Sequence, residues 1–243
     1  MTLRINMWSS PRNLSTAMMY AWRQRADTTV VDEPLYGYYL AKTGRSHPGD
    51  TDVIAAQNTN GDEVVTDVLL AEYDTPVVFF KQMAKHLLTV DRTFLSQGPN
   101  ILLTREPHDM LSSLQVQLPD VTIADTGFVE LCSILDSILA AGEEPIVIET
   151  RTLLANPEGV LRALCDRVGL PFDVGMMSWP AGPKPEDGVW APHWYDSVWR
   201  STGWQPYAPK NAVLVPSAEA ALDEATVAYE RLAPYRVAGV SAG

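Results

Sequence analysis

The sequence contains little cysteine and little positive charge. Its 243 residues include only two cysteines, Cys132 and Cys165, and both lie in apolar helical patterns rather than at the spacing of metal ligands. We therefore expect buried free thiols, and neither a disulfide nor a zinc site. Lysine and arginine number 18 against 30 aspartates and glutamates, which leaves a net charge of −12. A broad electrostatic attraction to nucleic acid or to an anionic membrane is therefore not expected.

Long hydrophobic segments are also missing. No apolar run approaches the roughly 20 residues that span a bilayer. Near the N-terminus, polar residues interrupt the apolar segment that a secretory signal requires, namely Arg4, Asn6, Arg12 and Asn13. The sequence therefore predicts a cytoplasmic protein with no membrane partner.

Several common catalytic signatures are absent. The chain has no Gly-x-Ser-x-Gly elbow of a serine hydrolase and no Gly-x4-Gly-Lys-Ser/Thr loop of a P-loop NTPase. The histidines His47, His108 and His193 do not stand at ligand spacing from other histidines, cysteines or carboxylates, so we expect no metal site. Serine hydrolysis, ordinary NTP hydrolysis and metal catalysis are therefore disfavoured.

Strand-like and helix-like patterns alternate along the chain. Five compact apolar or β-branched runs have the length of strands and lie at residues 3–7, 28–31, 76–80, 101–104 and 145–149. Helical patterns include residues 14–25, 121–141 and 156–168. This alternation predicts an α/β fold, with a mainly parallel central sheet of about five strands flanked by helices. The length and the hydrophobic content of 46% suit a single domain.

Two segments are predicted to lack regular structure. Residues 44–62 are rich in Gly, Asp, Asn and Thr, which favours a long mobile connection that could act as a substrate lid. Beyond residue 171, prolines follow one another closely and five of the seven tryptophans occur. We expect residues 171–243 to form an irregular C-terminal segment that wraps the domain.

The first candidate site is the turn between the first strand and the first helix. In a parallel α/β sheet, ligands bind at the carboxyl ends of the strands, and the amides of a helix N-terminus form an anion site. Arg12 supplies charge for a phosphate, Asn13 lines the turn, and Ser15 and Thr16 offer donors in the first helical turn. From the residues alone, an ordinary helix cap is an equally good interpretation.

This turn resembles the 5′-phosphosulfate loop of sulfotransferases that use the donor PAPS (3′-phosphoadenosine 5′-phosphosulfate). That loop typically reads Pro-Lys/Arg-Ser-Gly-Thr-Thr/Ser, and the matching residues here are Pro11, Arg12, Asn13, Leu14, Ser15 and Thr16. Asn13 replaces the usual Ser, and Leu14 replaces the usual Gly. The resemblance implies a P-loop NTPase-like sulfotransferase fold, PAPS as the co-substrate, and no metal.

The same resemblance implies a 3′-phosphate site made by an Arg after a later strand and a Ser eight residues further on. Arg105 and Ser113 have this spacing. Arg105 ends an apolar strand, Pro107 is suited to start a helix, and Ser113 then falls in its second turn. The alternative interpretation is a surface ion pair of Arg105 with Glu106 or Asp109.

A weaker resemblance lies in the C-terminal part of the chain. Residues 193–204 are similar to the loop by which sulfotransferases close over the 3′-phosphate of the nucleotide. The residues that this similarity assigns to the donor are Arg200, Ser201, Thr202 and Gly203. A tail buried by its tryptophans explains the same segment.

Sulfuryl transfer needs a base for the acceptor proton and a cation for the charge that develops on the donor. The resemblance gives the second role to Lys81, at the end of the third strand, but the histidine usually found two residues later is replaced by Met83. Glu33 and His86 are the remaining candidates for the base, with a slight preference for Glu33. The residues alone equally allow a helix-start charge for Glu33 and a packing role for His86.

These patterns predict an enzyme that moves the sulfuryl group of PAPS to a hydroxyl or amine of a small-molecule acceptor. The other product is PAP (3′-phosphoadenosine 5′-phosphate). Two alternatives stay open. One is a phosphotransferase of the nucleotide kinase type, which would need Mg²⁺ and a Walker-type lysine. The other is a non-catalytic nucleotide-binding protein that kept the fold and lost the base.

Overall fold

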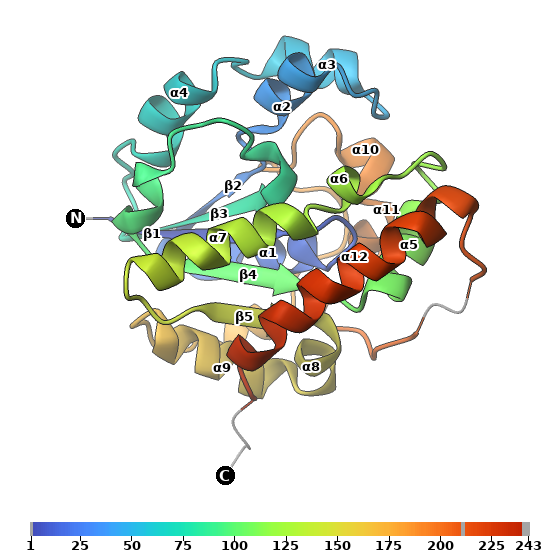
Figure 1. Cartoon of the computed structure of the whole chain (residues 1–243). Helices are drawn as coiled ribbons and strands as arrows, with labels where there is room; N and C mark the ends of the chain where they lie inside the picture. The colour runs from blue at the N-terminus through green and yellow to red at the C-terminus, as the bar shows by residue number, and fades with distance from the viewer. Residues whose placement is uncertain (1, 210–211, 240–243) are drawn as a thin grey trace.

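A central sheet organises the protein in a computed structural model that describes residues 2–209 and 212–239. Its five strands are all parallel and lie in the order β2-β3-β1-β4-β5 (Figure 1). Their bounds are Leu3–Ser9 (β1), Thr28–Asp32 (β2), Val77–Met83 (β3), Asn100–Thr104 (β4) and Ile146–Glu149 (β5). The predicted α/β fold, with a parallel sheet of about five strands, is confirmed.

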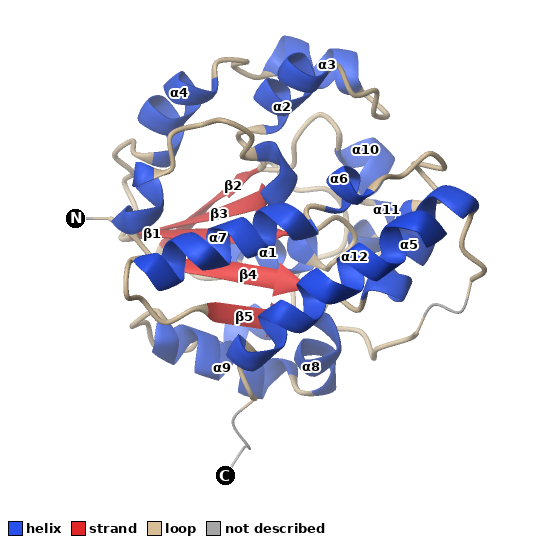
Figure 2. Ribbon diagram, viewed as in Figure 1, coloured by secondary structure: helices blue, strands red, loops and turns tan. Residues whose placement is uncertain are grey.

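Helices pack on both faces of this sheet (Figure 2). Their bounds are Ser15–Arg23 (α1), Tyr36–Thr43 (α2), Asp50–Ala56 (α3), Gly61–Val64 (α4), Pro107–Leu114 (α5), Ile123–Thr126 (α6), Phe128–Ala140 (α7), Thr150–Ala155 (α8), Pro157–Arg167 (α9), Ala191–Trp194 (α10), Asp196–Trp199 (α11) and Pro216–Leu232 (α12). Within the described ranges, no helix combines the length and the apolar character that crossing a membrane requires.

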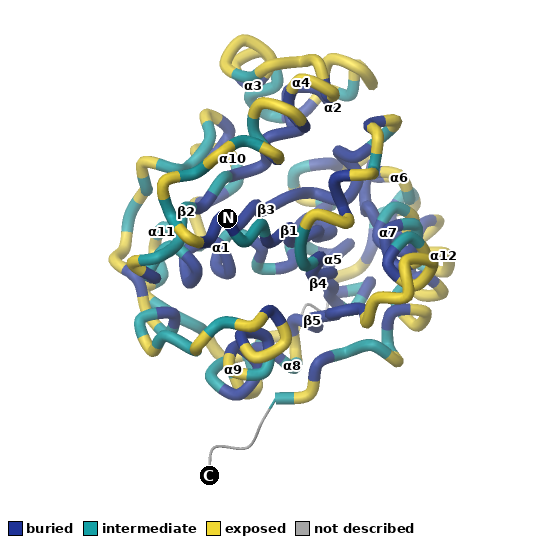
Figure 3. The backbone as a smooth tube through the Cα atoms, turned by 90° about the vertical axis from the view of Figure 1, so that its left-hand side faces the viewer, coloured by how far each residue is buried: buried dark blue, intermediate teal, exposed yellow. Residues whose placement is uncertain are grey.

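Side chains of each strand alternate between two hydrophobic layers. Trp8 and Phe80 pack with α5, α7 and α12, whereas their neighbours Met7 and Phe79 pack with α1 and α9. The backbone view shows the strands as a buried centre inside a more exposed shell of helices (Figure 3). Burial on both faces explains why these strands are continuous apolar runs in the sequence.

The C-terminal part is more regular than predicted. The composition of residues 171–243 predicts irregular structure, but α12 is a helix of 17 residues within them. Its buried stripe consists mainly of alanines, which lie at Ala218, Ala221, Ala225 and Ala228. Alanine forms helices well but adds little to a hydrophobic pattern, so the stripe is hard to detect in the sequence.

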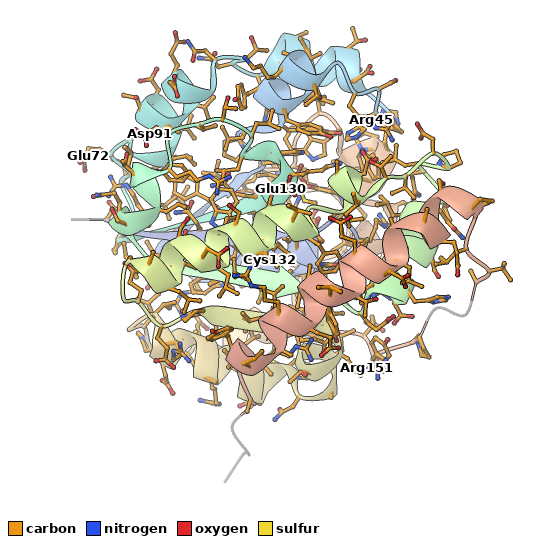
Figure 4. All side chains as sticks on the ribbon, in the orientation of Figure 1. Arg45, Glu72, Asp91, Glu130, Cys132 and Arg151 are labelled. Atoms are coloured by element: carbon orange, nitrogen blue, oxygen red, sulfur yellow. The ribbon has the colours of Figure 1, made fainter. Side chains whose placement is uncertain are left out.

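Both cysteines are buried and free, as predicted. The thiol of Cys132, which is labelled on α7 in Figure 4, contacts the Ala228 carbonyl of α12 at 3.6 Å.

The segment predicted to be a mobile connection, residues 44–62, is instead packed against the domain. It contains α3 and the start of α4, and Val53 is completely buried. Arg45, which is labelled in Figure 4, forms an ion pair with Asp125 of α6 at 3.0 Å and another with Asp120, before α6, at 2.8 Å. The Asn60 side chain caps α4 and Gly49 precedes α3, and such residues give the segment the composition of a loop.

The strand order places a crevice beside β1. From β1 the chain passes to β2 and β3 on one side and then to β4 and β5 on the other. The arrowheads of the strands point toward α5, α10 and α11 (Figure 1). Loops that follow β1 and β4 therefore diverge at a topological switch point, where open α/β sheets bind their ligands.

Candidate active site

A cavity of about 350 Å³ opens at this switch point. Its wall combines the loop after β1, the ends of β3 and β4, helix α2 and the C-terminal segment. Of the residues predicted as functional, those that line it are Pro11, Arg12, Asn13, Leu14, Ser15, Thr16, Glu33, Lys81, His86, Arg105, Ser113, Ser201 and Gly203. Segments far apart in the sequence are thus brought to one site.

The loop after β1 has an unusual backbone. Arg12 and Leu14 adopt positive φ angles of 63° and 69°, a left-handed conformation that costs a non-glycine residue roughly 1–2 kcal/mol. This geometry explains why the resembled loop has glycine at the position of Leu14. The Asn13 side chain holds the turn by donating to the Leu103 carbonyl at 3.2 Å. Strained residues of this kind cluster at functional sites.

The start of α1 does not have an ordinary side-chain cap. The N-cap residue is Leu14, and it makes no side-chain hydrogen bond to the first turn. Ser15 is the first residue of the helix, so it does not occupy the capping position. The first amides of α1 therefore lack the partner that a Ser or Asp cap would supply, which favours an anion site over the simple cap.

Two arginines and a serine meet beside this loop. Arg12 Nε donates to Ser113 Oγ at 3.0 Å, and Arg105 Nη1 donates to the Arg12 carbonyl at 3.0 Å. Arg105 Nε is buried and has no hydrogen-bond partner among the described residues. Burial and the charge of Arg105 lower the pKa of Arg12. The alternative ion pair with Asp109 is present but long, at 3.9 Å. Two adjacent cations, of which Arg105 is buried and Arg12 partly buried, indicate a site for an anion.

A second polar cluster surrounds Lys81. Lys81 lies opposite Asp32 in the β2–β3 register, and its Nζ contacts Asp32 Oδ1 at 2.9 Å and Glu33 Oε1 more closely. Its side chain is only 1% exposed, so the ammonium is shielded from solvent. Asp32 joins this cluster from the end of β2, next to Glu33. The two carboxylates compensate for the burial of the ammonium.

Tyr195 completes the cluster from the far end of the chain. Its hydroxyl donates to Asp32 Oδ2 at 2.7 Å and accepts from Trp190 Nε1 at 3.1 Å and from Lys81 Nζ. All three hydrogen-bonding positions of the hydroxyl are thus used. Tyr195 lies within residues 193–204, but the resemblance of that segment assigns it no role, because only the folding of the C-terminal segment brings it to the ends of β2 and β3.

Replacing Tyr195 by phenylalanine is expected to destabilise the protein by about 1–3 kcal/mol, because it leaves buried polar groups of Asp32, Lys81 and Trp190 without a partner. Chemical denaturation of the purified variant measures this change. The matched control is Tyr38→Phe, since among the described residues the Tyr38 hydroxyl pairs only with Thr89 Oγ1, at 3.1 Å, and its loss should cost about 0.5–1.5 kcal/mol. Equal stability of the Tyr195 variant and the wild type would contradict the assignment.

Glu33 and His86 lie next to each other at the cavity. Glu33 Oε2 is 3.8 Å from His86 Nδ1, and Glu33 has a positive φ of 39°. Burial is the largest effect on both groups: it raises the pKa of the Glu33 carboxyl and lowers that of His86 well below 6.5. His86 is therefore neutral at pH 7, and its ring stacks on Tyr36 with a centroid separation of 4.7 Å.

Of the four C-terminal residues predicted to bind the donor, two line the cavity and two do not. Ser201 and Gly203 line the cavity, and Ser201 Oγ accepts from Trp179 Nε1 at 3.1 Å. Arg200 instead pairs with Asp196 on the surface, where both side chains are 70% exposed, and Thr202 is also exposed. The assignment to the donor therefore has geometric support only for Ser201 and Gly203.

One group of side chains in the described part of the chain has ligand atoms close enough for a metal ion. Glu106, His108 and Asp109 place them within 4.8 Å of one another. The Glu106 carboxylate accepts the amides of His108 and Asp109 at 3.1 and 2.8 Å. Glu106 is thus the N-cap of α5, and its capping role explains why the three side chains lie close together.

Comparison with known proteins gives one family. A family profile described as "Sulfotransferase domain" matches residues 3–231. Two curated proteins of Arabidopsis thaliana, the branched-chain-amino-acid aminotransferase-like proteins 1 and 2, are 41% and 37% identical to this chain over 201 residues. The match covers 82% of this chain and 36% of each relative, so the chain spans about a third of their length.

Solved structures show the same fold. The sulfotransferase domain of the Synechococcus PCC 7002 olefin synthase has a TM-score of 0.55 at 14% identity, over 92% of this chain and 95% of that chain. The sulfotransferase domain from the curacin biosynthetic pathway has a TM-score of 0.58 at 16% identity, over 96% and 98% of the two chains. With a family match over nearly its whole length and this fold around the cavity, the chain belongs to the sulfotransferase domain family.

Proposed function

We propose that the protein transfers the sulfuryl group of PAPS to a hydroxyl of a small-molecule acceptor and releases PAP. The observation that carries the proposal is the pair of adjacent arginines that line the cavity at the loop after β1, with a carboxyl group of raised pKa in the same cavity. The anion site suits a nucleotide with several phosphates, and the carboxyl group suits proton removal. Two buried free thiols support a reducing compartment such as the cytoplasm.

The arginines and the loop would bind different phosphate groups of the donor. Arg12 and the first amides of α1 suit the phosphosulfate, while Arg105 and Ser113 suit the 3′-phosphate. The free Arg105 Nε offers a further donor for that group. Such preorganised donors stabilise the charge that develops on the bridging oxygen as the sulfur–oxygen bond breaks.

Glu33 is the better candidate for the base. During transfer, the acceptor oxygen loses its proton to the Glu33 carboxylate and forms a bond to sulfur, while the bond from sulfur to the phosphate oxygen breaks. Both carboxylate oxygens of Asp32 are held, by Lys81 and Tyr195, whereas Glu33 contacts Lys81 through Oε1 and presents Oε2 toward His86, so Asp32 is less available for this step. His86 is a weaker base because its pKa is lowered. In this chain Lys81 neutralises the carboxylates of Asp32 and Glu33. Arg12 and the loop amides would therefore stabilise the charge on the bridging oxygen of the donor.

A thermal-shift comparison of PAP, PAPS, AMP and ATP with Mg²⁺ tests this proposal. PAP and PAPS are expected to raise the melting temperature more than AMP, because only they carry the 3′-phosphate. Stabilisation by ATP with Mg²⁺ alone would favour the phosphotransferase. Stabilisation by PAP without transfer of ³⁵S-sulfate to any acceptor would favour the non-catalytic protein. No stabilisation by PAP rejects the proposed donor.

A further inference from the structure

A buried lysine without a counterion lies in another part of the cavity wall. Lys85 is 5% exposed, lines the cavity, and belongs to the short turn Ala84–His86 after β3. Its Nζ lies 3.5 Å from His47 Nε2 and 5.1 Å from the centre of the Tyr39 ring. Across residues 2–209 and 212–239, no carboxylate stands within 4.0 Å of this ammonium. A buried cation in this position lacks the anion that would normally accompany it.

Two of the nearby acidic groups are committed to other partners, and a third, Glu130, lies beyond ion-pair distance of Lys85 although its buried Oε2 has no hydrogen-bond partner among the described residues. Asp125 of α6 accepts from Arg45 at 3.0 Å and from Thr122, and Glu33 accepts from Lys81. These carboxylates act on Lys85 only from a distance, and burial lowers the pKa of Lys85 to about 8. The group is therefore mostly protonated at pH 7, and it has two N–H bonds that no described residue accepts.

The hydrogen-bond pattern around His47 adds a second donor. The Lys85 ammonium can only donate, so His47 Nε2 accepts and the ring proton is on Nδ1. His47 Nδ1 then donates to the Tyr36 hydroxyl, which is 2.7 Å away. The hydroxyl hydrogen of Tyr36 is thereby left without an acceptor in the described structure. Burial lowers the pKa of His47 to about 3, which agrees with a neutral ring.

We propose that Lys85 and Tyr36 bind a carboxylate of the acceptor, so that the sulfated substrate is a hydroxy acid. This inference rests on the proposed function, because it assigns the acceptor of that reaction. One ammonium and one hydroxyl match the single charge and the two oxygens of a carboxylate. His86 lies between the two ends of such a substrate, since it stacks on Tyr36 and neighbours Glu33.

The carboxylate site is separate from the donor site. Arg12, which suits the phosphosulfate, donates to the Trp194 carbonyl at 3.4 Å, and the Trp194 ring packs edge-on against His47 at 6.1 Å. Trp194 thus links Arg12 on one side to His47, the neighbour of Lys85, on the other. The donor phosphates have their own cations, and the Lys85 charge remains for a second ligand.

The experiment compares hydroxy acids with their methyl esters as acceptors of ³⁵S-sulfate from PAPS. The panel contains 3-hydroxybutanoate, 4-hydroxyphenylacetate and 12-hydroxydodecanoate, each with its ester. Wild-type protein is expected to prefer an acid to its ester. Lys85→Met should raise KM for that acid by roughly tenfold or more and leave KM for the ester unchanged. Lys85→Arg should restore part of the preference, and Lys42→Met, at an exposed lysine of α2, should behave as wild type.

The outcomes separate this inference from the proposed function. A melting temperature that PAP does not raise rejects the proposed donor and the inference with it. Where PAP stabilises the protein but no acid is preferred to its ester, the hydroxy-acid assignment is wrong and the donor site stands. An unchanged KM for the acid in Lys85→Met also overturns the assignment, and Tyr36→Phe provides the same test at the second donor.

Discussion

Replacing Glu33 by glutamine is expected to lower kcat by roughly 10³-fold, which is the usual loss when a general base is removed. Glutamine keeps the shape of the side chain and one acceptor for Lys81, so the fold and the donor site should survive. Initial rates with saturating PAPS measure the loss. A thermal shift with PAP equal to that of the wild type confirms that donor binding is intact.

The companion variant is His86→Gln, which tests the other candidate for the base. Its expected loss in kcat is at most about tenfold, because a histidine of lowered pKa is a poor base and mainly packs on Tyr36. A large loss in His86→Gln with near-normal turnover in Glu33→Gln would reverse the assignment. Full turnover in both variants would exclude both groups.

The pH profile supplies an independent signature of Glu33. The groups around it are Asp32, Lys81, Lys85 and His86, and burial outweighs the lysines, so the pKa of Glu33 is raised above the ordinary 4.5. A base acts only when it is deprotonated, so kcat should rise with pH through this raised pKa. The acidic limb should therefore lie above pH 4.5, and Glu33→Gln should lack it.

Replacing Arg105 by methionine is expected to weaken PAP binding by roughly 10- to 100-fold, the effect of losing a charge-assisted hydrogen bond. The methionine keeps much of the buried volume, although the contact with the Arg12 carbonyl is lost. Calorimetric titration with PAP and AMP measures the change. The loss should be much smaller for AMP, because AMP lacks the 3′-phosphate that Arg105 is proposed to hold.

Arg200→Met is the matched control for that experiment. The sequence resemblance assigns Arg200 to the donor, but it pairs with Asp196 on the surface. Its replacement should leave the affinity for PAP unchanged within about twofold, as exposed ion pairs contribute little. Weaker PAP binding in Arg200→Met than in Arg105→Met would show that the C-terminal segment closes over the donor.

Local patterns in the sequence are sufficient to predict the five strands, but not where each of them ends. Strands β3, β4 and β5 are buried throughout and are visible as short apolar runs, whereas β1 and β3 continue to Ser9 and Met83, past the residues predicted for them. The polar residue that follows an apolar run still marks a position near the carboxyl end of its strand. Arg105, Lys81 and Glu33 can be selected in this way from the sequence alone. The loop after β1 can be selected as well, because its residues are contiguous.

Tertiary structure alone decides which of these residues meet and which others join them. Tyr195 reaches Asp32 across 163 residues, and His47 reaches Lys85 across 38 residues, and no local pattern encodes such contacts. Polar composition predicts a mobile connection at residues 44–62, but capping and ion pairs hold that segment in place. The sequence shows that positive charge is scarce, and the folded protein shows where the cations of the cavity lie. Of the cations proposed to bind ligands, Arg105 and Lys85 are buried and Arg12 is partly buried, and this burial depends on packing that only the folded chain establishes.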